Sequence, residues 1–191
     1  MRPAPACGVL GLGNVLMHDD GFGPYAARCF SAAYELHPDV AVTDVGTPGL
    51  DLSPYLMVYE AVIVLDTVRL DAPPGSIRIY RKADLVRQPP KERLSPHDPG
   101  LGATLMLLEL QGSAPQDVVL VGVVPETVDT HLGLSDAVLR SVPDALAAVA
   151  EELARLGRPV RQRSEPEAPD LWWLRMETLS HPALSPPIAG R

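Results

Sequence analysis

Three runs of continuously apolar residues constrain the fold of this chain more than any other feature of its sequence. They cover residues 4–11, 61–65 and 118–124. Each run is shorter than a typical helix, and the second, Ala-Val-Ile-Val-Leu, is rich in the β-branched residues that strands prefer. Strands that are apolar throughout are buried on both faces, as in a parallel sheet covered by helices. The runs therefore predict an α/β protein.

Helical patterns and turn residues separate these runs. Apolar residues recur at helical spacing at positions 26, 29, 30, 33 and 34, and Pro24 predicts that this helix starts at residue 23 or 24. In chain order, the sequence then predicts a strand at 40–44, a short helix at 50–59, a half-exposed strand at 76–81 and a surface loop at 82–93.

Capping residues predict two further helices. Asp98 is the expected N-cap of the first, with Pro99 at the first helical position and the end near residue 110. Ser135 is the expected N-cap of the second, which we expect Pro143 to kink or divide. The alternation of strands and helices predicts a mainly parallel sheet with helices on both faces.

We expect an α/β domain at residues 1–157, closed by Gly157, and a tail at residues 158–191. The tail holds six of the 21 prolines and both tryptophans, Trp172 and Trp173. It is expected to be largely irregular, with the tryptophans docked either on the domain or on a partner.

The net charge of −8 argues against a nucleic-acid or anionic-membrane surface. The sequence has no secretory signal pattern at its amino end and no run of 18 apolar residues, so we expect a cytoplasmic protein without membrane insertion. Cys7 and Cys29 lie among apolar residues, which favours reduced, buried thiols over a disulfide or a metal site.

Polar residues follow the ends of the predicted strands. They are Asp19 and Asp20 after a glycine-rich turn, Asp44, Asp66 and, in a long loop, His97. Ligands of parallel sheets bind beyond the carboxyl ends of the strands, so these side chains are expected to gather there. Either Asp19 or Asp20 could instead serve only to cap the helix that follows.

Two carboxylates and an imidazole would supply two oxygen ligands and one nitrogen ligand. This set suits borderline divalent ions such as nickel, zinc or cobalt and leaves positions open for a second molecule. The residues are far apart in sequence and form no local metal-binding motif. Taken singly, each also fits an ordinary cap or loop residue.

The chain resembles the nickel-iron hydrogenase maturation endopeptidases in a series of motifs that occur in the same order. These are Gly-Leu-Gly-Asn-Val-Leu-Met-His-Asp-Asp-Gly-Phe-Gly at 11–23, Asp-Val-Gly-Thr-Pro-Gly at 44–49, the strand ending at Asp66, Ser-Pro-His at 95–97 and Val-Gly-Val-Val-Pro-Glu at 121–126. The resemblance implies a twisted, mostly parallel five-stranded sheet in a phosphorylase/hydrolase-like three-layer sandwich.

The resemblance also implies an activity. Members of this family are aspartic-type, nickel-dependent peptidases that remove a carboxyl-terminal extension from the hydrogenase large-subunit precursor after nickel insertion. The family's metal-binding and catalytic residues fall on Asp20, Asp66 and His97. Many members have glutamate at the first position, one methylene longer than Asp20. The implied partner is the precursor, which also supplies the nickel, and no organic cofactor is implied.

Three other functions fit the sequence to different degrees. A non-proteolytic maturation chaperone for the same subunit would use the same ligands, so the sequence does not separate it from a protease. A nucleotide-binding oxidoreductase would need a longer glycine motif than Gly11-Leu12-Gly13, because Leu16 stands at its last glycine position. A phosphorylase-like hydrolase would bind phosphate, which an acidic site disfavours.

Overall fold

A five-stranded sheet with strand order β3-β1-β4-β6-β5 forms the centre of the protein. The computed structural model describes residues 6–48, 52–87 and 100–179. Four strands run parallel: β1 (Cys7–Leu12), β3 (Val40–Gly46), β4 (Ala61–Thr67) and β6 (Asp117–Val123). The fifth, β5 (Ile77–Arg81), runs antiparallel to β6 at one edge. The predicted mostly parallel sheet is confirmed.

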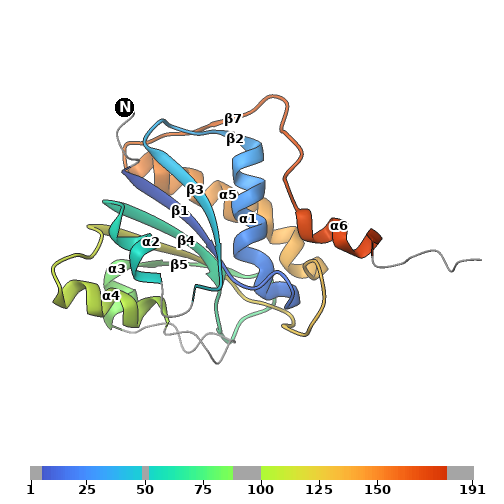
Figure 1. Ribbon diagram of the computed structural model, residues 1–191, viewed down its shortest axis with the longest axis horizontal. Helices are drawn as coiled ribbons and strands as arrows, with labels where there is room; N and C mark the ends of the chain where they lie inside the picture. Colours follow the sequence, from blue (N-terminus) through green and yellow to red (C-terminus); the bar gives the residue numbers. More distant parts are fainter. Residues whose placement is uncertain (1–5, 49–51, 88–99, 180–191) are drawn as a thin grey trace, which may run out of the picture.

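Helices cover both faces of this sheet (Figure 1). One face carries α1 (Phe22–Ala33) and α5 (Asp136–Arg155), and the other carries α2 (Ser53–Met57), α3 (Lys82–Arg87) and α4 (Leu101–Leu110). The remaining elements are the 3-10 helix η1 (His18–Gly21), the small antiparallel pair β2 (Tyr34–Glu35) and β7 (Arg161–Gln162), and α6 (Trp172–Leu179).

Two separate cores explain why the strands are apolar throughout. In β4, Ile63 and Leu65 face the core formed with α1 and α5, whereas Val62 and Val64 face the core formed with α2 and α4. Successive strand residues point to opposite faces, so every position of a strand that is covered on both faces is buried and favours an apolar residue. The prediction that the apolar runs form strands buried on both faces is confirmed.

An ion-pair cluster joins the antiparallel edge strand to the long helix α5. Glu152 of α5 accepts hydrogen bonds from Arg81 of β5 and, at 2.7 Å, from the Nε of Arg155. Burial by itself would raise the pKa of Glu152, but the hydrogen bonds and charges of these two arginines outweigh it and lower that pKa.

We predicted a surface loop at residues 82–93, and for residues 82–87 this prediction is wrong. Lys82–Arg87 form helix α3. Asp84 accepts a hydrogen bond of 2.9 Å from the backbone N–H of Arg81, and the side chain of Leu85 is fully buried. Burial of one apolar side chain stabilises this short helix, and the prolines that suggested a loop come only after it.

The boundaries of the other helices differ by small amounts from the prediction. Helix α1 begins at Phe22, so Pro24 lies in its first turn, where proline is tolerated. Helix α4 begins at Leu101 with Gly100 at the N-cap, not at Pro99, and the predicted cap Asp98 lies outside the described residues.

Helix α5 confirms its predicted caps. The Ser135 Oγ accepts from the backbone N–H of Val138, and Gly157 ends the helix with a positive φ of 74°. Pro143 does not divide the helix, which continues for 20 residues. The apolar stripe of α5 packs on the sheet along its length, and this burial outweighs the roughly 3 kcal/mol cost of an interior proline.

The tail is more ordered than predicted. Besides β7 it contains α6, and Trp173 on this helix is only 2% exposed, whereas Trp172 is 45% exposed. Residues 163–171 run without regular structure along α1 to reach α6 (Figure 1). The described part of the tail therefore docks on the domain through one of the two tryptophans.

Candidate active site

Glycines allow the start of α1 to sit directly against the ends of two central strands. Gly13 has a φ of 135°, and a Cβ atom there would lie 1.8 Å from the carbonyl oxygen of Asp20. A Cβ atom on Gly23 would lie 2.1 Å from the carbonyl oxygen of Leu12 and 2.4 Å from that of Leu65. Larger residues would push this turn away from the sheet. The glycines thus bring Asp20 to the carboxyl ends of β1 and β4.

Asp20 and Asp66 are both buried at this edge of the sheet, and Thr67 links them. The Thr67 backbone N–H donates to Asp66 Oδ1 at 2.8 Å, and its Oγ1 donates to Asp20 Oδ1 at 3.3 Å. Asp20 Oδ2 also accepts from the backbone N–H of Asn14 at 2.8 Å. Two carboxylates from distant parts of the chain are therefore held beside a shared neighbour, in the way that outer hydrogen bonds orient metal ligands.

Asp19 has a different environment, because its fully buried carboxylate connects η1 to the segment between β6 and α5. Its Oδ2 accepts from the backbone N–H of Glu126 at 2.8 Å, from that of Thr127 at 3.2 Å and from the Ser135 Oγ at 2.9 Å. Its Oδ1 accepts from the Ser135 backbone N–H at 2.7 Å. Asp19 therefore fixes the position of η1, and with it the position of the adjacent Asp20.

Backbone contacts reinforce this connection. The His18 N–H donates to the His131 carbonyl at 2.9 Å, and the His131 N–H donates to the Leu16 carbonyl at 3.1 Å. The two imidazole rings meet edge to face, with centroids 5.0 Å apart. His18 has a φ of 48°, an uncommon conformation for a residue other than glycine. Such strain is retained where the surroundings determine the backbone, often at functional sites.

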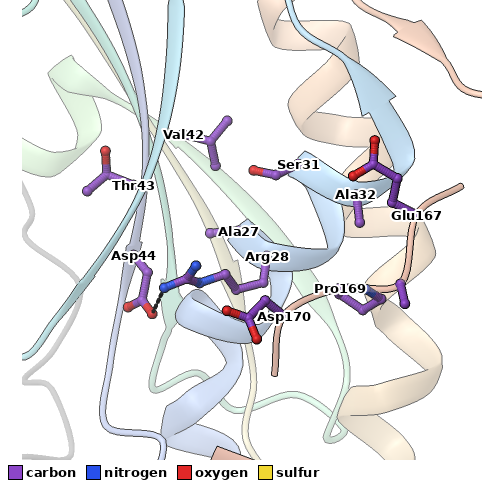
Figure 2. A pocket seen from close by; sticks show the side chains of 11 residues that line it. Ala27, Arg28, Ser31, Ala32, Val42, Thr43, Asp44, Glu167, Pro169 and Asp170 are labelled. Carbon is purple, nitrogen blue, oxygen red and sulfur yellow. Dashed lines mark hydrogen bonds and ion pairs between the residues drawn. The ribbon is translucent and has the colours of Figure 1, made fainter. Parts of the chain in front are cut away.

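Asp44 pairs with an arginine of α1 and not with these two carboxylates. Its Oδ2 lies 3.3 Å from a guanidinium nitrogen of Arg28 on α1, and the two side chains meet beside β3 (Figure 2). Its position in β3 follows the prediction, but its described contact is with the helix.

The third predicted ligand, His97, lies outside the described residues. Within residues 6–48, 52–87 and 100–179, no group of three or more histidine, cysteine, aspartate or glutamate side chains is placed to hold a metal ion. The metal site formed by Asp20, Asp66 and His97 therefore stays a prediction. The role of Thr67 was not predicted from the sequence, although a hydroxyl side chain next to Asp66 indicates a hydrogen-bond donor close to the proposed ligands.

The two cysteines lie away from these carboxylates and are poor nucleophiles. Burial raises the pKa of Cys7 to about 11 and that of Cys29 to about 11. Because the thiolate is the reactive form, both side chains stay protonated near neutral pH. Both are free cysteines, as expected, but only Cys7 is buried, whereas Cys29 is partly buried.

Comparisons with known proteins point to one family. Residues 24–152 match the family model for hydrogenase maturation proteases. The hydrogenase expression/formation protein HoxM of Cupriavidus necator is 32% identical over 158 residues, which is 82% of this chain and 78% of HoxM. The hydrogenase 2 maturation protease of Escherichia coli K12 is 32% identical over 150 residues, covering 78% of this chain and 91% of the relative.

A solved structure agrees with these sequence matches. The hydrogenase maturating endopeptidase HybD from E. coli superposes with a TM-score of 0.73 at 31% identity, and the match covers 86% of this chain and 99% of HybD. Among the described helices, none is both long enough and apolar enough to span a membrane.

Proposed function

Because this chain belongs to the hydrogenase maturation protease family, we propose that it cleaves the carboxyl-terminal extension from the large-subunit precursor of a nickel-iron hydrogenase once nickel has been inserted. The family match supports a peptidase activity that acts on a hydrogenase precursor. The main structural support for the site is the pair of buried carboxylates at the carboxyl edge of the sheet, Asp20 and Asp66, which are joined through Thr67.

In this proposal nickel is part of the substrate, carried by the precursor. Asp20 and Asp66 bind it through oxygen and His97 binds it through nitrogen, a donor set suited to a borderline divalent ion. Thr67 and Asn14 orient the two carboxylates before the substrate arrives, which lowers the cost of ordering them on binding. A precursor without nickel would lack the atom that these side chains recognise.

Bound by these side chains, the nickel would mark the precursor as ready for cleavage, and as a Lewis acid it would also be able to polarise the scissile carbonyl. The role of this chain is to place that carbonyl. Its carboxylates hold the nickel-bearing end of the precursor over the ends of β1 and β4. The connection through Asp19 keeps η1, and with it the carboxylate of Asp20, in position while the peptide binds.

Variants of the three proposed ligands test the assignment. Asp20→Asn, Asp66→Asn and His97→Ala are each expected to abolish cleavage of a nickel-loaded precursor and to leave the circular dichroism spectrum unchanged. Asp71→Asn, which alters an exposed aspartate, is the matched control and should cleave normally. Unimpaired cleavage by any two of the three ligand variants would show that the ligands are assigned wrongly.

Single-turnover cleavage separates this proposal from a maturation chaperone that uses the same ligands. Purified protein in excess over a nickel-loaded precursor should release the extension. The same precursor without nickel should remain intact. Binding of the loaded precursor without cleavage would favour the chaperone.

A further inference from the structure

A cavity of about 420 Å³ lies beside the edge strand β3, away from the two carboxylates of the proposed site. Figure 2 shows its walls: β3 on one side, α1 behind, and residues 167–170 of the tail on the other side. Its volume is within the range of about 300–1,000 Å³ that is common for ligand sites. The tail wall lies beyond residues 24–152, the part that matches the family model.

The strand wall of this cavity has unused backbone hydrogen-bonding capacity. Among the described strands, β3 pairs only with β1, so alternate N–H and C=O groups along β3 point away from the sheet. Val42, Thr43 and Asp44 of this edge line the cavity. An open strand edge next to a cavity is the arrangement that binds an extended peptide as an additional strand.

The charges around the cavity are balanced. Asp44 pairs with Arg28 at 3.3 Å, and Asp170 pairs with Arg175 at 2.6 Å. The remaining acid in the lining, Glu167, lies 3.5 Å from an arginine of the tail. Because each carboxylate has a guanidinium partner, the cavity has no strong preference for a charged ligand. Recognition through backbone hydrogen bonds fits this lining better than recognition of a charged side chain.

Small side chains leave room for a peptide backbone to approach. They are Ala27, Ser31, Ala32 and Ala168.

The tail wall is fixed to the domain. The backbone N–H of Glu167 donates to the Ala32 carbonyl at 3.0 Å, and that of Arg163 donates to the Ala33 carbonyl at 2.8 Å. Further along the tail, Trp173 is buried. The tail residues that line the cavity are therefore held in place by hydrogen bonds to α1.

The register of the sheet relates the cavity to the proposed site. Asp44 of β3 lies opposite Gly11 of β1, and Gly11 lies opposite Leu65, the residue before Asp66. A strand added outside β3 would lie three strand spacings, about 14 Å, from β4. An extended chain covers that distance in about four to five residues.

We propose that this cavity is a subsite of the protease, in which an extended segment of the precursor binds alongside β3 through backbone hydrogen bonds. The segment lies about four to five residues from the scissile bond. This inference rests on the proposed function, since it takes its ligand from the proposed substrate.

The test uses the full-length protein and a synthetic peptide that spans the cleavage region of a large-subunit precursor. Ser31→Trp on α1 and Ala168→Trp in the tail each fill the cavity from a different wall. Leu110→Trp, at a position that is 83% exposed on the opposite face of the sheet, is the matched control. Peptide affinity is measured by isothermal titration calorimetry, and circular dichroism identifies any variant that does not fold.

Loss of two backbone hydrogen bonds would weaken binding about tenfold, so both cavity variants should raise Kd by about that factor or more, and the control should not. Peptides N-methylated at single positions give a second readout that does not depend on variant folding. Affinity should fall at alternate residues, the period of strand pairing, and changes of side-chain charge should have little effect. Wild-type affinity in either folded cavity variant, or N-methylation effects without a period of two, would overturn the proposal.

Failure of the subsite and failure of the proposed function give different results. If the proposed function is wrong, the loaded precursor stays intact in the presence of wild-type protein, whatever the peptide titrations show. If only the subsite is wrong, wild-type protein cleaves the precursor, and Ser31→Trp and Ala168→Trp cleave it with unchanged KM.

Discussion

Replacement of Asp19 by asparagine should destabilise the protein strongly, because no orientation of the amide satisfies the donors around it. The carboxylate accepts four hydrogen bonds, one at Oδ1 and three at Oδ2. In the better orientation the new NH₂ group faces only the Ser135 N–H, 2.7 Å away in the native protein. That contact becomes donor against donor, and the three other bonds lose their charged acceptor.

The magnitude follows from these contacts. Loss of one buried, charge-assisted hydrogen bond costs about 1.5–3 kcal/mol, and weakening of three more adds a comparable amount. The free energy of unfolding of Asp19→Asn should therefore fall by about 3–5 kcal/mol in urea titrations. Amide hydrogen exchange should accelerate first at residues 16–20 and 126–135, the two segments that Asp19 connects.

A nearby substitution provides the control. Asp129 is exposed in the same segment and accepts from the Thr127 Oγ1 at 2.7 Å. Asp129→Asn should change the free energy of unfolding by no more than about 0.5 kcal/mol. If Asp19→Asn stays within about 1 kcal/mol of the wild type, or if exchange accelerates uniformly, then Asp19 does not hold the two segments together.

Three further predictions concern other parts of the fold. Gly13→Ala should lower the thermal midpoint and abolish precursor cleavage, since the added Cβ meets a carbonyl oxygen at 1.8 Å, and normal cleavage by this variant would contradict the packing argument. Cys7 and Cys29, with pKa values of about 11, should react with Ellman's reagent at pH 8 only after unfolding, and rapid reaction of the native protein would show that they are accessible. Glu152→Gln should destabilise the protein at neutral pH. Because the pKa of Glu152 is lowered on folding, the difference from wild type should shrink as pH falls from about 4.3 through the folded value, and a gap that stays constant would refute this.

The central strands could be predicted from sequence because burial on both faces leaves a local signal. Every residue of β1 and β4 is buried, so no alternation of polarity obscures the run. Helices α3 and α6 left no such signal. Each is short and depends on tertiary burial of one side chain, Leu85 or Trp173, which the local pattern does not reveal.

The candidate site was predictable in part for a related reason. The rule that ligands bind beyond the carboxyl ends of parallel strands brings Asp20 and Asp66 to one edge of the sheet, and the structure places both side chains there beside Thr67. The partners of Asp19 could not be foreseen, since Glu126 and Ser135 are 107 and 116 residues away in sequence. His97 stays a prediction.

The contacts of the two adjacent acids bear on the choice that the sequence left open. An ionised carboxylate has about four lone-pair positions, two on each oxygen. At Asp19, three donors share Oδ2 and one donor binds Oδ1, so at most one position is left, on a side chain that is fully buried. A metal ion at Oδ2 of Asp19 would have to displace donors that hold η1 in place. Asp20 receives one donor at each oxygen, from Thr67 and from Asn14, and so retains about two lone pairs. Acceptor capacity therefore favours Asp20 as the proposed ligand and assigns Asp19 to holding it in position. Asp20→Glu, which keeps this capacity, should accordingly retain precursor cleavage, whereas Asp19→Glu should lose stability. The opposite pattern in paired cleavage and urea-unfolding measurements would reverse the two roles.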